Sequence, residues 1–222
     1  MRKFKRPAMR LRINQRNVLP GILIGCLIIL LHGCKTIPTV TQTDTVATTV
    51  LFDPATSAQK TPAYDFNILG RIAIQDEKQS FSGSFRWEHQ TTNDVILLFA
   101  PLGQAVAEIT KDEEGVRLIT SKMEGYYAND TEALTEQILG WRLPLDGLKY
   151  WIQGMHSPLT AAEKDLDRQN QLLAIRQDGW HIHYNSFTQT SFSSAPLPKN
   201  IHLFFENQKL KIRLIVDNWK VN

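Results

Sequence analysis

The amino-acid sequence predicts a single α+β domain in which a strongly curved antiparallel sheet carries two helices across its concave side. Three observations lead to this fold class. Short apolar or alternating segments dominate from residue 64 to residue 222, turn signals separate most of them, and the helical patterns lie together in the middle. The length of 222 residues is sufficient for one domain with a substantial core. A charged fraction of 21% and an apolar fraction of 42% exclude wholesale disorder.

Residues 1–33 are typical of a secretory signal. They contain seven Arg and Lys residues and no acidic residue, and an apolar stretch of 14 residues follows the basic part at 18–31. This stretch is shorter than the roughly 20 residues that a membrane-spanning helix needs. The cysteine at the expected cleavage position is similar to a bacterial lipobox, so we expect Cys34 to be lipidated. Two alternatives stay open: an uncleaved anchor helix, and Cys26, which fits the consensus letters better but shortens the apolar segment to about seven residues.

Residues 34–63 form the second predicted region. Nine Thr and three Pro occur among the 28 residues from 35 to 62, with almost no apolar periodicity. We therefore expect a disordered tether with a root-mean-square reach of roughly 30 Å. Lys35 follows the cysteine in place of the aspartate that retains many lipoproteins in the inner membrane. We accordingly expect the protein to be anchored in the outer membrane and to face the periplasm.

Strands begin after residue 64. Five are expected in the first half of the domain, at residues 66–75, 81–87, 95–99, 105–111 and 116–120. The second of these alternates aromatic and polar residues with a period of two, which predicts one apolar face. Asp112-Glu113-Glu114-Gly115 separates the last two strands and is typical of a solvated hairpin turn rather than of a catalytic carboxylate cluster.

Two helices are expected in the middle of the chain. Asn129 and Glu132 have the spacing of a capping box, and Gly140 suits a C-terminal cap. After Pro144, Asp146 can cap a second short helix. These signals predict two consecutive helices, both carrying apolar residues on one side.

Strands return in the last part of the chain, after a polar segment at residues 157–170 that we expect to be irregular. The expected strands lie at residues 172–177, 180–185, 201–206 and 209–216. Asp178-Gly179 is the strongest two-residue hairpin signal in the sequence, and Asn207-Gln208 separates the next pair. Residues 64–222 are therefore predicted to form one domain.

Composition and motifs argue against several functional classes. After residue 33 the chain carries 18 basic and 22 acidic residues, which is the opposite of the balance that nucleic-acid binding needs. Nucleophile-elbow, zinc-protease, phosphate-loop and Cys-x-x-Cys motifs are absent from the sequence. His181 and His183 lie on the same face of one strand, but a solvent-facing pair is a simpler interpretation than a metal site. We expect no enzyme activity, metal or cofactor.

The region around residue 100 is the most informative about binding. Residues 95–99 are apolar on both sides of the expected strand, so the strand is either buried on both faces or forms part of a sheet that encloses an apolar cavity. The turn Pro101-Leu102-Gly103 places a leucine where polar residues are usual. Leu102 is either folded back onto the core or offered to another apolar phase, and tethering to a membrane favours the second alternative.

Six short motifs carry a resemblance to a known family. In chain order they are Phe85-Arg86-Trp87, Ala100-Pro101-Leu102-Gly103, Tyr127-Ala128-Asn129-Asp130, Leu143-Pro144-Leu145, Trp151-Ile152-x-Gly154 and Asp217-Asn218-Trp219-Lys220-Val221. Each motif is weak alone, but their order and spacing after a lipobox are specific. From about residue 66 to residue 222 the chain resembles the LolB family of outer-membrane lipoprotein receptors.

The resemblance implies an open, incomplete antiparallel β-barrel of about 9–11 strands with a helical lid over a hydrophobic cavity. It implies a monomer that accepts triacylated lipoproteins from the periplasmic carrier LolA and inserts them among the outer-membrane lipids without nucleotide. It also implies a membrane insertion loop made of Pro101, Leu102 and Gly103. Cavity positions matched by pattern are Phe85, Trp87, Leu97, Phe99, Leu139, Trp151 and Ile152. The alternative is an outer-membrane lipoprotein that binds another hydrophobic ligand or acts as an assembly scaffold.

Overall fold

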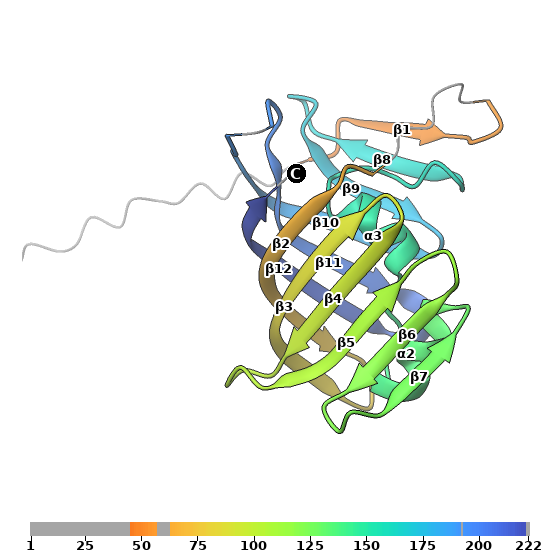
Figure 1. Ribbon diagram of the computed structural model, residues 1–222. Helices are drawn as coiled ribbons and strands as arrows, with labels where there is room; N and C mark the ends of the chain where they lie inside the picture. The colour runs from red at the N-terminus through yellow and green to blue at the C-terminus, as the bar shows by residue number, and fades with distance from the viewer. Residues whose placement is uncertain (1–44, 57–62, 192, 221–222) are drawn as a thin grey trace, which may run out of the picture. The chain divides into compact units, whose positions relative to one another are not determined.

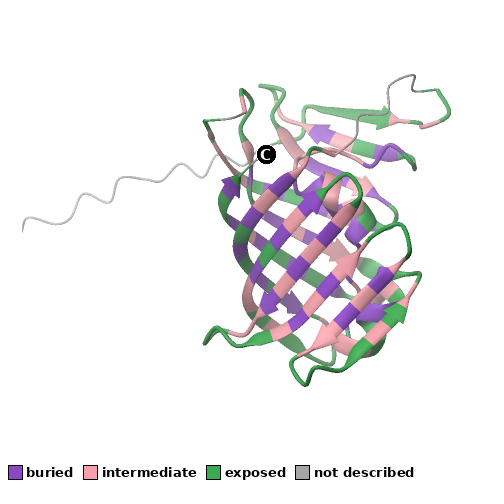
Figure 2. Cartoon of the chain, viewed as in Figure 1, coloured by how far each residue is buried: buried purple, intermediate pink, exposed green. Residues whose placement is uncertain are grey.

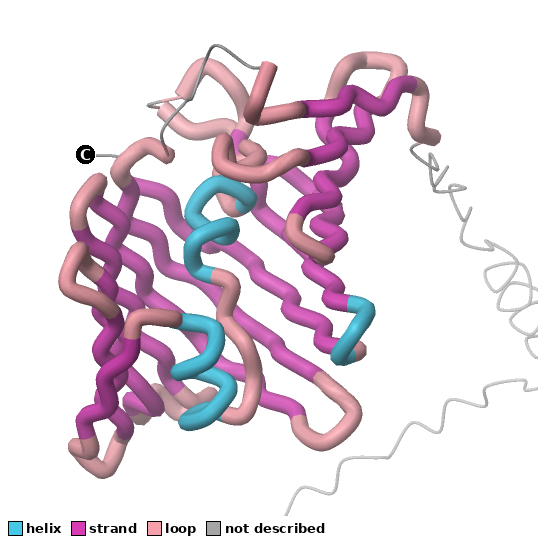
Figure 3. The backbone as a smooth tube through the Cα atoms, turned by 90° about the vertical axis from the view of Figure 1, so that its right-hand side faces the viewer, coloured by secondary structure: helices cyan, strands magenta, loops and turns pink. Residues whose placement is uncertain are grey.

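The computed structural model describes residues 45–56, 63–191 and 193–220. All of them belong to one compact unit, Asp44–Asn222. In this unit twelve described strands form one antiparallel sheet, and two helices lie against its concave side (Figures 1 and 3). The expected signal segment and Cys34 lie outside the described residues, so their processing and lipidation stay predictions.

In chain order, the elements are β1 (Thr48–Phe52), β2 (Phe66–Gln75), β3 (Ser80–Gln90), β4 (Asn93–Phe99), β5 (Ala105–Lys111), β6 (Val116–Thr120), β7 (Gly125–Ala128), α2 (Thr131–Leu139), α3 (Leu145–Trp151), β8 (Ala162–Leu166), β9 (Leu172–Gln177), β10 (Trp180–Thr188), β11 (Leu197–Phe205), a single 3-10 turn η1 (Glu206–Gln208) and β12 (Leu210–Lys220).

The sheet is open. Its hydrogen-bonded order is β1-β8-β9-β10-β11-β12-β2-β3-β4-β5-β6-β7, and β1 and β7 end the row without pairing with each other. Helices α2 and α3 connect β7 to β8 and cross the concave side between the two ends of the sheet (Figure 3). The predicted α+β class with an open antiparallel barrel is confirmed. The strand number exceeds the predicted 9–11 because the sequence pattern did not reveal β1, β7 and β8.

Strand β1 lies in the segment that was predicted to be a disordered tether, so that prediction is wrong for Thr48–Phe52. Its β-branched residues favour an extended backbone, and it pairs along the whole length of β8. The Thr49 hydroxyl donates to Asp165 at 2.7 Å, and the rings of Phe52 and His156 lie 3.9 Å apart. These contacts close an edge of β8 that would otherwise be unpaired.

Strand β8 lies in the segment expected to be irregular, which corrects a second prediction. Two residues of this polar strand, Ala162 on one face and Asp165 on the other, are buried. Asp165 is paired with Arg176 on β9, at 2.9 Å between Oδ1 and Nη2. The Arg176 side chain lowers the pKa of Asp165, because it donates to the ionised carboxylate. A charged strand is stable in this position because its partner strand supplies the opposite charge.

The helices begin close to the predicted positions, although different residues cap them. Asp130, not Asn129, caps α2 and accepts from the amides of Glu132 and Ala133 at 2.8 and 3.1 Å. Helix α3 begins after Pro144 without a side-chain cap, and Asp146 lies inside its first turn rather than capping it. Among the described residues, no helix is both long and apolar enough to cross a bilayer.

Buried and exposed residues alternate along the central strands, as the bands in Figure 2 show. The inward residues of the sheet join the helices in one apolar core. The largest fully buried side chains of that core include Phe66, Trp87, Trp151 and Trp180. All buried residues of the core lie between Phe66 and Trp219, so the domain carries its whole core without the N-terminal region.

Candidate functional site

Strands β3 and β4 supply one wall of the apolar interior. Phe85 and Trp87 face inward and are 4% and 2% exposed. Across the antiparallel pair, Phe85 lies opposite Leu98 and Trp87 lies opposite Ile96. Residues directly opposite each other share a face of the sheet, so Leu98 and Ile96 line the interior too. They are 2% and 4% exposed.

Leu97 and Phe99 lie on the other face, so their prediction as cavity residues is wrong. They are paired with Arg86 and Ser84, which face away from the core, and both are only partly buried. The error has a physical cause. Strand β4 is apolar on both faces, and only its register against β3 decides which set faces inward. Once Phe85 and Trp87 are placed inside, that register identifies the inward set.

The remaining predicted cavity residues lie on the helical side of the interior. Trp151 ends α3 and Ile152 follows it, and they are 1% and 0% exposed. Leu139 ends α2 and is partly buried against the core. The structure thus brings together Phe85, Trp87, Trp151, Ile152 and Leu139 around one core. The buried apolar side chains of the sheet and of the helices form one cluster.

A buried glutamine fixes α3 to the sheet. Gln177 at the end of β9 is 4% exposed, and its Oε1 accepts from the Trp151 indole nitrogen at 2.9 Å and from the Ser157 amide at 2.8 Å. The Tyr184 hydroxyl donates to the Trp151 carbonyl at 2.8 Å, and burial raises the pKa of this phenol well above its usual range. The sequence pattern did not identify either residue, because a single polar letter at the end of a strand gives no sign of burial.

Helix α2 is attached differently. Its buried residues are Thr131, Leu134 and Thr135, and its outer contacts are polar and exposed. The C-cap residue Gly140 accepts from Gln79 Nε2 at 2.6 Å, and the Glu136 carboxylate accepts from a side-chain amide of the η1 turn at 3.3 Å. Exposed hydrogen bonds of this kind contribute little net free energy, because water replaces them readily. The two lid helices are therefore unequally held: buried hydrogen bonds join α3 to the sheet, whereas α2 is joined to it by exposed hydrogen bonds and by packing of its buried residues, and its buried hydrogen bond runs to the Leu143 amide within the lid.

The loop between β4 and β5 projects an apolar side chain into solvent. It is a tight turn, in which the Gly103 amide donates to the Ala100 carbonyl and the Ala100 amide donates to the Gln104 carbonyl, both at 2.8 Å. Gly103 has a φ of 85°, a left-handed conformation that glycine adopts without steric cost. Leu102 is 87% exposed, so it points away from the core and not back onto it.

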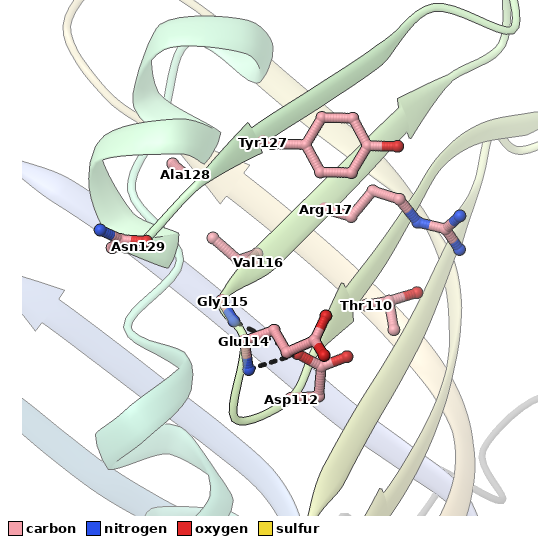
Figure 4. A pocket seen from close by; sticks show the side chains of 9 residues that line it. All are labelled: Thr110, Asp112, Glu114, Gly115, Val116, Arg117, Tyr127, Ala128 and Asn129. Atoms are coloured by element: carbon pink, nitrogen blue, oxygen red, sulfur yellow. Dashed lines mark hydrogen bonds between the residues drawn. The ribbon is translucent and has the colours of Figure 1, made fainter.

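The hollow in Figure 4 lies apart from this interior. It has a volume of about 520 Å³ and lies at the β5–β6 hairpin, beside Arg117 and Tyr127. Asp112 accepts from the amides of Glu114 and Gly115 at 2.9 and 3.2 Å, so its carboxylate stabilises the turn. This confirms the interpretation of the acidic segment as a turn. The polar lining does not suit an acyl chain.

The histidine pair also has its predicted arrangement. His183 is exposed and His181 is partly exposed, whereas the alternate residues of β10 are buried. Partial loss of hydration on the sheet lowers the pKa of His183, and the neighbouring His181 lowers it further. In the described part of the chain, the His, Cys, Asp and Glu side chains form no group of three or more that could hold a metal.

Comparison with known proteins places this architecture in a family. The family profile described as outer membrane lipoprotein LolB matches residues 64–219. The chain belongs to the LolB family. A LolB from Nitrosomonas europaea is 41% identical over 198 residues, which are 89% of this chain and 91% of the relative. A LolB from Thiobacillus denitrificans is 36% identical over 168 residues, which are 75% of this chain and 87% of the relative. A solved LolA superfamily protein from Nitrosomonas europaea has a TM-score of 0.47 at 9% identity, covering 73% of this chain and 88% of that one.

The six motifs on which the LolB resemblance rested have distinct structural places. Phe85-Arg86-Trp87 places two aromatic rings on the inner wall, the turn with Leu102 lies at a tip of the sheet, and Trp151-Ile152 forms the buried end of α3. Trp219 at the end of β12 is 8% exposed and packs edge-on against Phe66, with ring centroids 5.8 Å apart. The LolB motifs therefore mark the apolar interior, its lid and its projecting loop.

Proposed function

We propose that the protein is an outer-membrane-anchored receptor that accepts triacylated lipoproteins from the periplasmic carrier LolA and inserts them into the outer membrane. One observation carries the proposal: an open sheet encloses an apolar interior under an unequally held helical lid, and an exposed leucine projects from the same sheet. Membership of a family named for outer-membrane lipoproteins supports the location and the class of client.

The physical chemistry of acyl chains explains why such a receptor needs this interior. Each methylene removed from water contributes about 0.8 kcal/mol, so one long acyl chain exposed to water costs on the order of 10 kcal/mol. Three chains cannot cross an aqueous compartment unprotected. They need an apolar path from carrier to receptor to membrane. Handover along such a path breaks no covalent bond, so a nucleotide is not needed in the receptor.

Helix α2 is the part of the lid that moves in this proposal. The interior residues are buried beneath the helices and the sheet, so acyl chains enter only if a covering element gives way. Helix α3 is anchored to the sheet through Gln177 and Tyr184, whereas the hydrogen bond between α2 and the β2–β3 turn lies at the surface. Outward movement of α2 would uncover the side of the interior formed by β6 and β7 without breaking the buried hydrogen bonds of α3.

The exposed Leu102 supplies the membrane step. Its side chain has almost no protein contact to lose, so inserting it between lipids adds apolar burial without weakening the fold. The tight turn below it holds the side chain outward. We assign the loop Pro101-Leu102-Gly103 to contact with the outer membrane, where the acyl chains leave the protein.

The test separates receipt of the client from its delivery. A soluble form comprising residues 35–222 is mixed with LolA that carries a triacylated lipoprotein, and the client is followed by pull-down and then by insertion into liposomes. Leu102→Glu is expected to receive the client normally but to deliver it at least tenfold more slowly, on the order of the burial free energy of one leucine. Leu51→Glu is the matched control, because Leu51 is 74% exposed on β1.

Each outcome has a distinct meaning. Equal delivery by Leu102→Glu removes the membrane role of the loop. Retention of the client on LolA by the unsubstituted protein refutes the receptor proposal. If an apolar dye then binds, the alternative of another hydrophobic ligand is favoured, and if no dye binds, the scaffold alternative is favoured.

A further inference from the structure

A second exposed apolar side chain lies beside the loop of Leu102. Met123, in the turn between β6 and β7, is 83% exposed, and Leu102 is 87% exposed. These are the two highest values among the large apolar side chains of the described residues. Single exposed apolar residues are common on protein surfaces, but two at one place indicate an interaction site.

The two turns are neighbours because β5 pairs with both β4 and β6. The amide of Ser121, in the second turn, donates to the carbonyl of Val106 near the start of β5 at 3.0 Å. Neighbouring strands are about 4.8 Å apart, so the bases of the two turns lie roughly 10 Å apart. Figure 1 shows both turns at the lower end of the sheet.

The second turn holds Met123 outward. Its φ is 63°, a left-handed conformation in which glycine and asparagine are much more common than methionine. The Met123 amide donates to the Thr120 carbonyl at 2.9 Å, and the Thr120 amide donates to the Glu124 carbonyl at 3.0 Å. A flexible apolar side chain thus occupies the tip of a closed turn, where it has little protein surface to cover.

The charges beside Met123 suit a lipid surface. Lys122 is exposed and takes part in no ion pair of the described residues. On the other side of Met123 in the chain, the Glu124 carboxylate accepts from the Tyr126 hydroxyl at 3.2 Å. A free ammonium group next to an apolar tip matches the bilayer interface, where lipid phosphates lie just above the acyl region.

We propose that the turn of Lys122 and Met123 is a second membrane contact, which acts together with Leu102. Met123 enters the acyl boundary and Lys122 binds the phosphate groups of anionic lipids. Two points of contact orient the end of the sheet toward the bilayer, which one leucine alone cannot do. The inference rests on the proposed membrane step of Leu102 and deepens it.

The test uses site-specific fluorescence. Residues 35–222 contain no cysteine, and the whole core lies within them, so one introduced cysteine gives a single labelling site. Met123→Cys, Leu102→Cys and the control Leu51→Cys are labelled with an environment-sensitive dye and mixed with vesicles of phosphatidylethanolamine, with or without phosphatidylglycerol. The emission maximum of the dye at positions 102 and 123 should shift to shorter wavelength when vesicles are added, and that of the dye at position 51 should not.

Two further variants separate the apolar and ionic contributions. Met123→Ser should weaken vesicle binding on the order of tenfold. Lys122→Gln should weaken it about fivefold, and only when phosphatidylglycerol is present. Circular dichroism checks that each variant is folded.

Each result decides the proposal. A shift at position 102 without one at position 123 overturns the second contact and leaves the role of Leu102 intact. No shift at either position removes the whole membrane step, and the LolA pull-down then shows separately whether the receptor step survives. A shift at position 51 as large as the other two indicates non-specific adsorption and also overturns the proposal.

Discussion

Replacing Gln177 by leucine tests whether α3 is the fixed part of the lid. The side chain is 4% exposed, and leucine has a similar size, so the substitution removes polar contacts without opening a large cavity. Gln177 Oε1 accepts from Trp151 and from the Ser157 amide, and its Nε2 donates to the carbonyls of Ser157 and Thr160 at 2.9 and 3.0 Å.

The expected loss follows from the groups left without partners. Leucine leaves two buried donors unsatisfied, the Trp151 indole N–H and the Ser157 amide. Each such group costs about 1–3 kcal/mol, so the free energy of unfolding should fall by about 2–6 kcal/mol. Folded domains of this kind are stable by only about 5–15 kcal/mol, so the change is large enough to measure.

Urea denaturation of residues 35–222, followed by tryptophan fluorescence and circular dichroism, measures this loss. Gln169→Leu is the matched control, because Gln169 is exposed in the turn between β8 and β9 and should change stability by less than about 0.5 kcal/mol. A loss below about 1 kcal/mol for Gln177→Leu would falsify the buried network as the anchor of α3. Hydrogen exchange in α3 should also rise in this variant, whereas exchange in α2 should already be fast in the unsubstituted protein.

Three further predictions follow from the same structure. Leu98→Ala should lower the free energy of unfolding, measured by urea denaturation, by about 2–5 kcal/mol, and Leu97→Ala by about 1 kcal/mol, because only Leu98 faces the core. Equal losses for the two variants would contradict the assignment of these residues to opposite faces. Burial lowers the pKa of His156 to about 4, so the unfolded chain takes up the proton first and stability should fall as the pH drops from about 6.5 toward 4. His156→Leu should flatten that pH dependence in denaturation curves, and an unchanged slope would refute the assignment. Gly140→Ala should lower the free energy of unfolding by about 1–2 kcal/mol, because φ is 89°, a left-handed conformation that is strained for alanine, and a stability equal to that of the unsubstituted protein would contradict this.

The local sequence pattern was sufficient to predict which side chains face inward wherever one face of an element is apolar and the other is polar. The alternation in β3 identified Phe85 and Trp87 as inward residues, and both are buried. The Asp178-Gly179 signal predicted a hairpin, and both residues have the positive φ that such a turn requires. These features are determined by residues that are adjacent in the sequence, so they can be predicted from one sequence alone.

The errors arose where a partner distant in the sequence decides the structure. Strand β8 is extended because Arg176 on β9 pairs with its acidic residues, and β1 is extended because β8 offers an unpaired edge. The facing of Leu97 depends on the register of β4 against β3, since both faces of β4 are apolar. The role of Gln177 depends on Trp151, which lies 26 residues earlier in the chain.

The energetics of the lid explain how the closed form and the proposed transfer fit together. Leu134 is the only fully buried apolar side chain of α2 itself, while Ile138 and Leu139 are partly buried. A fully buried side chain contributes about 1.5–3 kcal/mol, so moving α2 outward costs only a few such contributions. In the proposed handover the acyl chain comes from the carrier and not from water, so the helix that gives way has to be the one whose displacement costs less. Displacing α3 would cost more, because it would also break the hydrogen bonds to Trp151.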